Sequence, residues 1–246
     1  AQNIMVATVQ GDIFYLRNGR VPVRPIGFDF SRPVPGNTSD SEWKGIHPIS
    51  DLIQMSNPPQ GYMQNCNISP AHLMKDSPLT RERFQDRPYL YNESDRLHQR
   101  AAMVLELLEE NEKVTQEQAV NVALSTEVYK AGLWQNMLRA VGDPGLETFR
   151  QSILRWDRRT RPTSKGALAY KYWKAALGEK LARLVDPFEA PRGILTNHAL
   201  LSALRSAAGR MYSQFGTWET TYGQVHRVGR RGGKDYPVGG GTLRSV

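Results

Sequence analysis

Seven prolines punctuate residues 20–59, and they constrain the fold more than any other feature of this chain. Proline fixes its own φ at about −65° and restricts the residue before it, so no helix runs through such a stretch. The stretch also contains Phe28, Phe30 and Trp43, whereas a flexible linker would carry Gly and Ser without aromatic side chains. We therefore predict an ordered, extended loop region whose aromatic residues pin it to the rest of the molecule.

Residues 3–17, before this loop, have the pattern of a β-hairpin. Two apolar runs, 4–9 and 13–17, flank a turn that contains Gly11. The first run is apolar at successive positions, which is typical of a strand buried on both faces. We predict that the hairpin lies within a sheet that is covered on both sides.

Helical periodicity replaces this pattern after Pro70. Asn92 or Ser94 is a candidate N-cap for a first helix, and the capping box at 115–118 predicts the start of a second. Further helices are predicted over 146–156, over about 165–185, and from 196 or 197 onward. The residues expected to face inward are Leu97, Ala101, Val104 and Leu108 in the first helix, and Val120, Ala123, Leu124 and Val128 in the second.

The last segment returns to the composition of loops and strands and contains a glycine run, 239–241. Glycine loops that bind phosphate follow a strand and open a helix, and neither this context nor a P-loop lysine is present. We interpret the run as a close approach of two backbone segments. The predicted division is a sheet and loop segment 1–94, a helical region 95–215, and a truncated return to the sheet over 216–246.

The composition excludes several classes of protein. One cysteine in 246 residues rules out an internal disulfide framework and a cysteine-based zinc site, and the five histidines lack metal-ligand spacing. No run of about 18 apolar residues occurs, so we expect no membrane insertion. Residues 1–6 do not have the pattern of a secretory signal.

The formal net charge of +8 is unevenly distributed. Six basic residues stand against Asp157 within 150–165, and five stand against Asp235 within 226–246. Such clusters bind phosphates in some proteins, so one alternative is a non-catalytic helical binding or scaffold domain with basic patches for an anionic partner. The clusters lack interleaved aromatics and a known reading motif. We therefore expect solvated surfaces and no nucleic acid partner.

Residues 57–70 form the candidate site, because a turn and a short apolar pair lead there into amide side chains around Cys66. Loops at strand ends commonly carry functional residues, but Asn also forms turns, and the pattern alone leaves both interpretations open. As a nucleophile, Cys66 would need a base and an orienting group. No histidine stands at a diagnostic spacing, so an unpaired core thiol is the favoured interpretation.

Short motifs follow one another in a specific order through the first seventy residues. They are Ile13-Phe14-Tyr15, Asn18-Gly19-Arg20-Val21-Pro22, Gly27-Phe28-Asp29, Pro33-Val34-Pro35-Gly36, Glu42-Trp43-Lys44-Gly45, Asn57-Pro58, Gly61-Tyr62 and Gln64-Asn65-Cys66-Asn67-Ile68-Ser69-Pro70. In this order they strongly resemble the β subunit of the penicillin acylase family, which includes penicillin G, cephalosporin, acyl-homoserine lactone and lipopeptide acylases. Looser matches continue at 95–96, 154–157 and 222–227.

The family consists of N-terminal nucleophile hydrolases, so the resemblance implies a fold and an activity. The expected fold is α+β, part of an αββα sandwich with an inserted, mostly helical region. The expected activity is hydrolysis of an acyl-amide bond of the penicillin, cephalosporin, acyl-homoserine lactone or lipopeptide type, through an acyl-enzyme. The resemblance also implies a zymogen with autocatalytic cleavage and a periplasmic or secreted location. No cofactor is expected, although the resemblance allows a structural Ca²⁺.

By position, the second Asn of the family's Asn-x-Asn-x-Ser-Pro motif is Asn67, which the resemblance makes the oxyanion-hole side chain. A fixed, neutral amide donor suits a developing oxyanion. Arg96 falls where the family has an active-site arginine, but the spacing from the motif is longer here than in penicillin G acylase. An arginine in the first turn of a helix also commonly forms a salt bridge, here to Asp95 or Glu93.

One departure from the family pattern concerns the nucleophile. In the family it is a Ser, Thr or Cys at the start of the β subunit, with its own α-amine as base, whereas residue 1 here is Ala. We therefore expect an interior segment that is inactive alone. Its expected partners are the α subunit, the remaining β-subunit segments of the same precursor, and a small-molecule N-acyl substrate.

Overall fold

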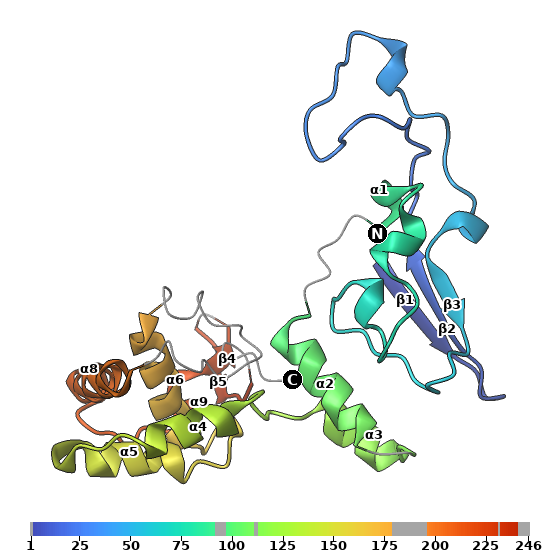
Figure 1. The fold of residues 1–246 in the computed structure, drawn as a ribbon. Coiled ribbons are helices and arrows are strands. Elements are labelled where there is room, and N and C mark those ends of the chain that lie inside the picture. The colour runs from blue at the N-terminus through green and yellow to red at the C-terminus, as the bar shows by residue number, and fades with distance from the viewer. Residues whose placement is uncertain (1, 92–96, 111–112, 179–195, 231, 241–246) are drawn as a thin grey trace. The chain divides into compact units, whose positions relative to one another are not determined.

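The computed structural model describes residues 2–91, 97–110, 113–178, 196–230 and 232–240. They form two compact units, 1–105 and 106–246, which are treated separately below (Figure 1). The predicted mixed α+β class is confirmed. The strands are β1 (Gln2–Ala7), β2 (Ile13–Asn18), β3 (Gln54–Ser56), β4 (Arg227–Gly229) and β5 (Asp235–Pro237), and the helices are α1 (Pro88–Tyr91), α2 (Gln99–Glu109), α3 (Gln116–Ala123), α4 (Ala131–Arg139), α5 (Glu147–Leu154), α6 (Gly166–Ala176), α8 (Asn197–Phe215) and α9 (Tyr222–Val225).

An antiparallel sheet in the order β1-β2-β3 forms the centre of the first unit. The predicted hairpin is confirmed, with Met5 opposite Tyr15 on β2 and Tyr15 opposite Met55 on β3. Tyr15 is fully buried. The core of this unit consists of Tyr15, Ile53, Leu73, Met74, Leu79 and Tyr91.

The first strand is more exposed than its sequence predicts. Ile4, Met5 and Val6 on β1 are 38%, 39% and 47% exposed. Within the described residues β1 is an edge strand that pairs only with β2, and the described core gathers around Tyr15 of the neighbouring strand. The prediction that both faces of the hairpin are covered is therefore wrong for this part of the chain.

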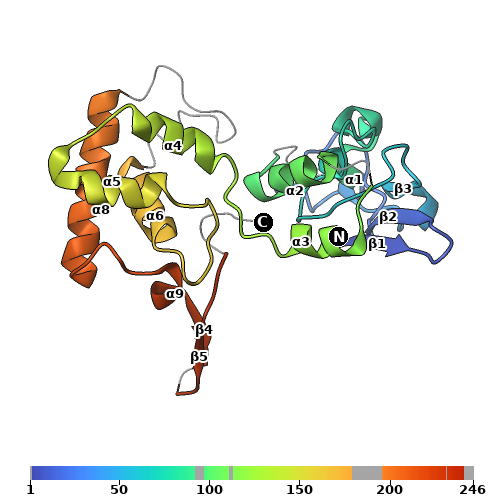
Figure 2. The ribbon, with the colours of Figure 1, turned by 90° about the horizontal axis from the view of Figure 1, so that it is seen from below.

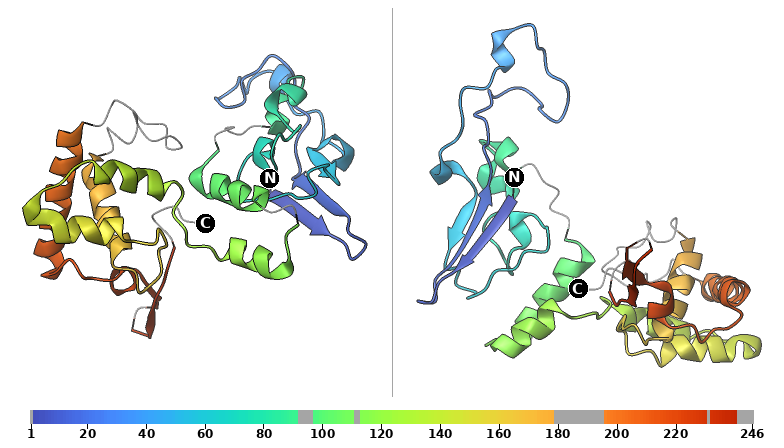
Figure 3. Two further views of the ribbon diagram at one scale, coloured as in Figure 1. Left: turned by 60° about the horizontal axis from the view of Figure 1, so that its bottom comes forward. Right: turned by 180° about the vertical axis from the view of Figure 1, so that it is seen from behind.

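Residues 20–51, which we call the arm, leave the sheet as an extended loop and return to it before β3 (Figure 3). Backbone pairing fixes its base: the amides of Val23 and Lys44 donate to Gly45 and Val23 carbonyls, each at 2.9 Å. The arm is thus ordered, as its prolines predict. Trp43 was expected to pin the arm to the body, but it is exposed, and its ring lies beside Arg24 of the same arm.

Helices α4, α5, α6 and α8 build the core of the second unit (Figure 2). Helix α6 packs against both α5 and α8. Its Trp173 is fully buried and lies edge-on to Trp134 of α4, with ring centroids 6.2 Å apart. The later helices predicted from the sequence therefore pack against one another.

Helix α3 confirms one prediction and contradicts another. The capping box is present, since the Thr115 side chain accepts from the Gln118 amide and the Gln118 side chain accepts from the Thr115 amide. Val120 and Leu124 are exposed, however, so their predicted inward position is wrong. The helix is only eight residues long and has no buried residue. The predicted caps Asn92 and Ser94, and the part of the fourth helix beyond 178, lie outside the described residues.

The glycine run makes the close backbone approach predicted for it. A Cβ on Gly239 would lie 2.4 Å from the Thr160 carbonyl oxygen, and the next amide, Gly240, donates to the same oxygen at 3.1 Å. Strands β4 and β5 pair with each other in a separate two-stranded sheet. The return of 216–246 to the first sheet stays a prediction, because residues 241–246 lie outside the described residues.

Gln135 is a buried polar residue of α4 that closes the end of α5. Its Nε2 donates to the carbonyls of Ile153 and Trp156, both at 2.9 Å. We predict that Gln135→Leu lowers the stability of this unit by about 1–2 kcal/mol, because two buried acceptors lose their donor. Urea unfolding of the full-length protein measures this, with the exposed Asn136→Ala as control. Equal stability of the two variants would contradict the prediction.

His226 makes this unit sensitive to acid. Its ring stacks on Tyr222, and its Nδ1 donates to the Tyr222 carbonyl at 3.0 Å, so Nε2 accepts from the Lys171 ammonium at 2.6 Å. Burial, and secondarily the Lys171 charge, hold the pKa of His226 below its usual 6.5. The unfolded chain therefore binds this proton more readily than the folded chain, and stability falls as the pH drops below about 6.5.

This pH dependence is measured as the melting temperature of the full-length protein between about pH 7 and pH 5. The His226→Gln variant, which has no titrating ring, is expected to lose less stability over this range than the unchanged protein. Identical pH profiles for the two proteins would show that His226 does not contribute.

Candidate active site

The backbone at Asn67 has a left-handed conformation, with φ of +61°. Asn adopts this conformation more readily than most residues. The Asn65 side-chain oxygen accepts from the Asn67 amide at 3.0 Å and closes an Asx turn. The turn interpretation of this motif is therefore correct, and its effect is to present the side chain of Asn67 at the surface.

Arg100 of α2 orients the Asn67 amide. Its Nη2 lies 2.8 Å from Asn67 Oδ1, and because a guanidinium only donates, the oxygen of the amide must face it. Nδ2 then points away from Arg100, and it has no acceptor among the residues that the structure describes. Asn67 thus offers a fixed, neutral N–H donor, which is the group expected at this position.

His98 and Arg100 together hold the backbone beside this amide. The Ala101 amide donates to His98 Nδ1 at 3.2 Å, so the neutral ring carries its proton on Nε2. That nitrogen donates to the Cys66 carbonyl at 2.9 Å, and Arg100 donates to the same oxygen. The first turn of α2 therefore fixes both the backbone and the side chain of the site loop.

The sheet supports the loop from the other side. Asn3 on β1 donates through Nδ2 to Asn65 Oδ1 at 3.2 Å. Its own oxygen accepts from the hydroxyl of the buried Tyr15 at 2.7 Å. The Asx turn that shapes Asn67 is thus tied to the core through two side chains.

Tyr91 anchors the end of the motif. Its buried hydroxyl accepts from the Ala71 amide at 3.1 Å and lies 3.4 Å from Ser69 Oγ. Ser77 Oγ donates to the Pro70 carbonyl at 2.8 Å. The site loop, residues 65–70, is therefore hydrogen-bonded at both ends to side chains that are tied to the core or buried.

Cys66 does not have the surroundings of a nucleophile. Burial raises the pKa of its thiol, an effect that the nearby Arg100 charge only partly offsets. The adjacent His98 bonds the Cys66 carbonyl oxygen, not its sulfur. The thiol is free, as predicted, but it is half-buried and does not belong to the core.

Arg96, the second predicted site residue, lies outside the described residues. The structure instead brings Arg100 to Asn67. The two arginines are four residues apart, which is about one helical turn. The sequence offered this spacing as a signal for Arg100, and the structure leaves the prediction for Arg96 untested.

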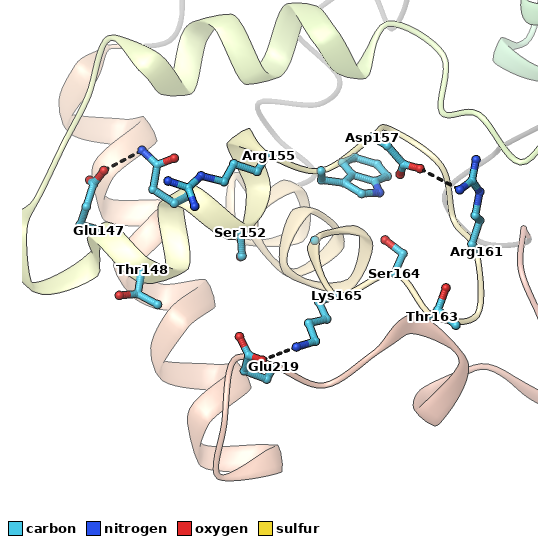
Figure 4. Close-up of a pocket in the computed structure, with 13 residues that line it drawn as sticks. Glu147, Thr148, Ser152, Arg155, Asp157, Arg161, Thr163, Ser164, Lys165 and Glu219 are labelled. Carbon is cyan, nitrogen blue, oxygen red and sulfur yellow. Dashed lines mark hydrogen bonds and ion pairs between the residues drawn. The ribbon is translucent and has the colours of Figure 1, made fainter.

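A cavity of about 680 Å³ lies in the second unit, between α5 and the start of α6 (Figure 4). Its charged groups are largely paired: Lys165 with Glu219, and Arg161 with Asp157 at 3.5 Å. The nucleophile, base and oxyanion donor that catalysis requires are not assembled among its described lining residues. The cavity is open to solvent, and Asn67 lies in the other unit.

Part of each basic cluster is paired with carboxylates in the same way. Arg150 pairs with Glu147 at 2.9 Å, Arg159 with Glu127 at 3.1 Å, and Arg227 with Asp235 at 2.8 Å. Paired surface charges attract polyanions weakly. These pairs weaken the case for a scaffold that binds an anionic partner, which stays an untested alternative.

The described residues were also examined for metal-binding clusters and for helices that could span a membrane. They contain no group of three or more His, Cys, Asp or Glu side chains that could hold a metal ion. Among the same residues, no helix is long and apolar enough to span a membrane.

Comparison with known proteins places this arrangement in a family. The Penicillin amidase family matches residues 1–244. The chain belongs to this family. Among its relatives in the family are Penicillin G acylase from Escherichia coli, 35% identical over 124 residues, and Penicillin acylase 2 proenzyme from Pseudomonas sp. (strain SE83), 28% identical over 179 residues. These matches cover 50% and 71% of the chain, respectively.

The fold also matches a solved penicillin amidase family member. The thermostable Penicillin G acylase from Alcaligenes faecalis is similar over 88% of the chain, with a TM-score of 0.52 and 17% identity. This likeness shows a shared fold. The chain spans 48% of that structure, and 13% and 21% of the Escherichia coli and Pseudomonas relatives.

Proposed function

We propose that the protein to which this chain belongs hydrolyses an acyl-amide bond, and that Asn67 donates a hydrogen bond to the oxyanion. The observation that carries this proposal is the pairing of Asn67 Oδ1 with Arg100, which leaves Nδ2 as a preorganised donor. Family membership supports amide hydrolysis as the reaction. The reaction then runs through an acyl-enzyme.

The remaining groups of the reaction come from other segments of the same precursor. An N-terminal nucleophile, with its α-amine as base, attacks the amide carbonyl; the amine leaves, and water hydrolyses the acyl-enzyme. Asn67 Nδ2 stabilises the tetrahedral intermediate of each step. Arg100 strengthens this donor, because a cation at Oδ1 withdraws electron density from the amide and prevents its rotation. Arg96 remains a second candidate for this region.

The proposal also covers the fold that contains this chain and the location of the protein. We place the chain in an αββα sandwich completed by the α subunit and the other β-subunit segments, and we place the protein in the periplasm or outside the cell. The relative from Pseudomonas is named a proenzyme, which supports processing of a precursor. The acyl group is of the penicillin, cephalosporin, acyl-homoserine lactone or lipopeptide type. Both relatives are named penicillin acylases, and the name of the Escherichia coli relative makes penicillin G the first substrate to test.

The proposal is tested with the full-length protein and penicillin G, followed by an N-acyl homoserine lactone. We expect release of the free amine, and an acid-quenched protein whose mass is increased by one acyl group. Release of amine without any covalent intermediate would contradict the acyl-enzyme. Absence of hydrolysis across all four substrate types would contradict the proposed function.

Arg100→Ala tests the orientation of the amide. We predict that kcat falls about 10- to 100-fold with little change in KM, because Asn67 keeps its donor but loses the group that directs it. The matched control is Arg205→Ala, which removes an exposed arginine that pairs with Asp143 in the other unit. An unchanged kcat in Arg100→Ala would show that the amide is oriented without this contact.

A further inference from the structure

A second site is built around Arg24 in the arm. Three aromatic rings surround its guanidinium: the distances from Cζ to the ring centroids are 5.1 Å for Phe30, 6.0 Å for Trp43 and 5.7 Å for Tyr89. A cation within about 6 Å of a ring face is attracted to it. These rings position the charge, and they leave its hydrogen-bond donors unused.

The charge of Arg24 has no carboxylate partner among the described residues. Two acids of the arm are engaged elsewhere, Asp29 with Ser31 and Arg32, and Asp51 with His47. The other two, Asp40 and Glu42, form no ion pair with Arg24 among the described residues. Arg24 Nε is buried and makes no hydrogen bond. An unsatisfied buried donor costs about 1–3 kcal/mol, so this guanidinium is poised for an acceptor.

The ring of Tyr89 is held in place independently of Arg24. Its hydroxyl lies 2.9 Å from His47 Nε2, and His47 Nδ1 lies 2.9 Å from Asp51 Oδ2. The side chain of His47 is only 5% exposed. The Tyr89 wall of the cage is therefore in place before any ligand arrives, which reduces the entropy lost on binding.

Large apolar side chains stand exposed near the cage in sequence. Ile26 is 88% exposed, Trp43 61% and Ile49 64%. Scattered exposed apolar residues are common, but here they accompany a cation that lacks a counter-charge. A carboxylate with apolar neighbours on both sides complements this combination.

We propose that the arm binds a peptide segment in which an Asp or Glu side chain lies between apolar residues. The carboxylate bonds the guanidinium of Arg24, which suits bidentate recognition, and the neighbouring apolar side chains pack on Trp43 and the exposed isoleucines. A peptide is favoured over a free carboxylate because the exposed side chains extend the contact along the chain. This binding surface is separate from Asn67 and goes beyond the proposed hydrolysis.

The test uses the full-length protein on a biosensor surface with two probes, acetyl-Ile-Leu-Glu-Leu-Ile-amide and the same peptide with Gln in place of Glu. We expect the Glu peptide to bind at least about tenfold more tightly. Arg24→Gln removes this preference and Arg24→Lys reduces it. Arg32→Gln, which changes an exposed arginine of the same arm, leaves it intact.

Three binding results would overturn the proposal, and a competition experiment adds a fourth. The three are equal binding of the two peptides, a preference that persists in a folded Arg24→Gln variant, and no binding of the Glu peptide at about 1 mM. Isobutyrate separates a small-molecule site from a peptide site. If it displaces the Glu peptide at equal concentration, the site recognises free carboxylates and the peptide assignment is wrong.

Discussion

Replacing Asn67 with glycine in the full-length protein is expected to lower kcat by about 100- to 1,000-fold. Removal of the side chain takes away the Nδ2 donor while the backbone keeps its freedom to adopt the φ of +61°. Glycine is the better test than alanine, because alanine adds about 1–2 kcal/mol of left-handed backbone strain. KM is expected to change little, since the donor acts mainly on the developing oxyanion.

Two further variants separate the donor from the fold. Asn67→Asp keeps the contact between an oxygen and Arg100 but has no N–H to donate, so we expect it to be as slow as Asn67→Gly. Asp76→Gly is the matched control, because Asp76 is an exposed residue of the same unit with a left-handed φ of +50°. Steady-state kinetics with penicillin G measure all three. Turnover by Asn67→Asp at the rate of the unchanged protein would remove Asn67 from the oxyanion hole.

The sequence predicts Asn67 because its motif is local. An Asx turn forms between neighbouring residues, Asn65 and Asn67, so the residues that shape it are adjacent and recognisable. Which arginine contacts Asn67 is harder to predict, because the contact is not local. It depends on where α2 begins and on a contact across more than thirty residues, and helix boundaries are poorly specified by propensity.

Two other differences have the same origin. Helix α4 escapes prediction because its N-cap, Lys130, has a left-handed backbone and no side-chain cap, so the usual start signal is missing. The exposure of β1 depends on what covers a sheet, which the alternation within one strand does not reveal. Local chemistry was thus predictable, whereas the partner of each surface was not.

Replacing a helical glycine of the second unit with alanine is expected to have a large effect on stability, whose sign depends on the position. Gly166 begins α6, and a Cβ there would lie 2.4 Å from both the Ser152 carbonyl oxygen and Trp156 Cβ. Neither atom belongs to a flexible chain end, so α5 and α6 must move apart in Gly166→Ala. We expect a loss of about 3 kcal/mol, at the upper end of the usual cost of overpacking.

Gly209 in the middle of α8 supplies the matched control, because a Cβ there has no atom within 4 Å. Gly209→Ala is expected to stabilise the unit by about 0.5–1 kcal/mol, since alanine loses less backbone entropy in a helix. The same substitution thus has opposite signs at two helical positions, and only the distance between α5 and α6 accounts for the difference. Hydrogen exchange of the α5, α6 and α8 amides in the full-length protein measures both. Equal protection in the two variants would show that α5 and α6 do not approach as closely as their backbones indicate.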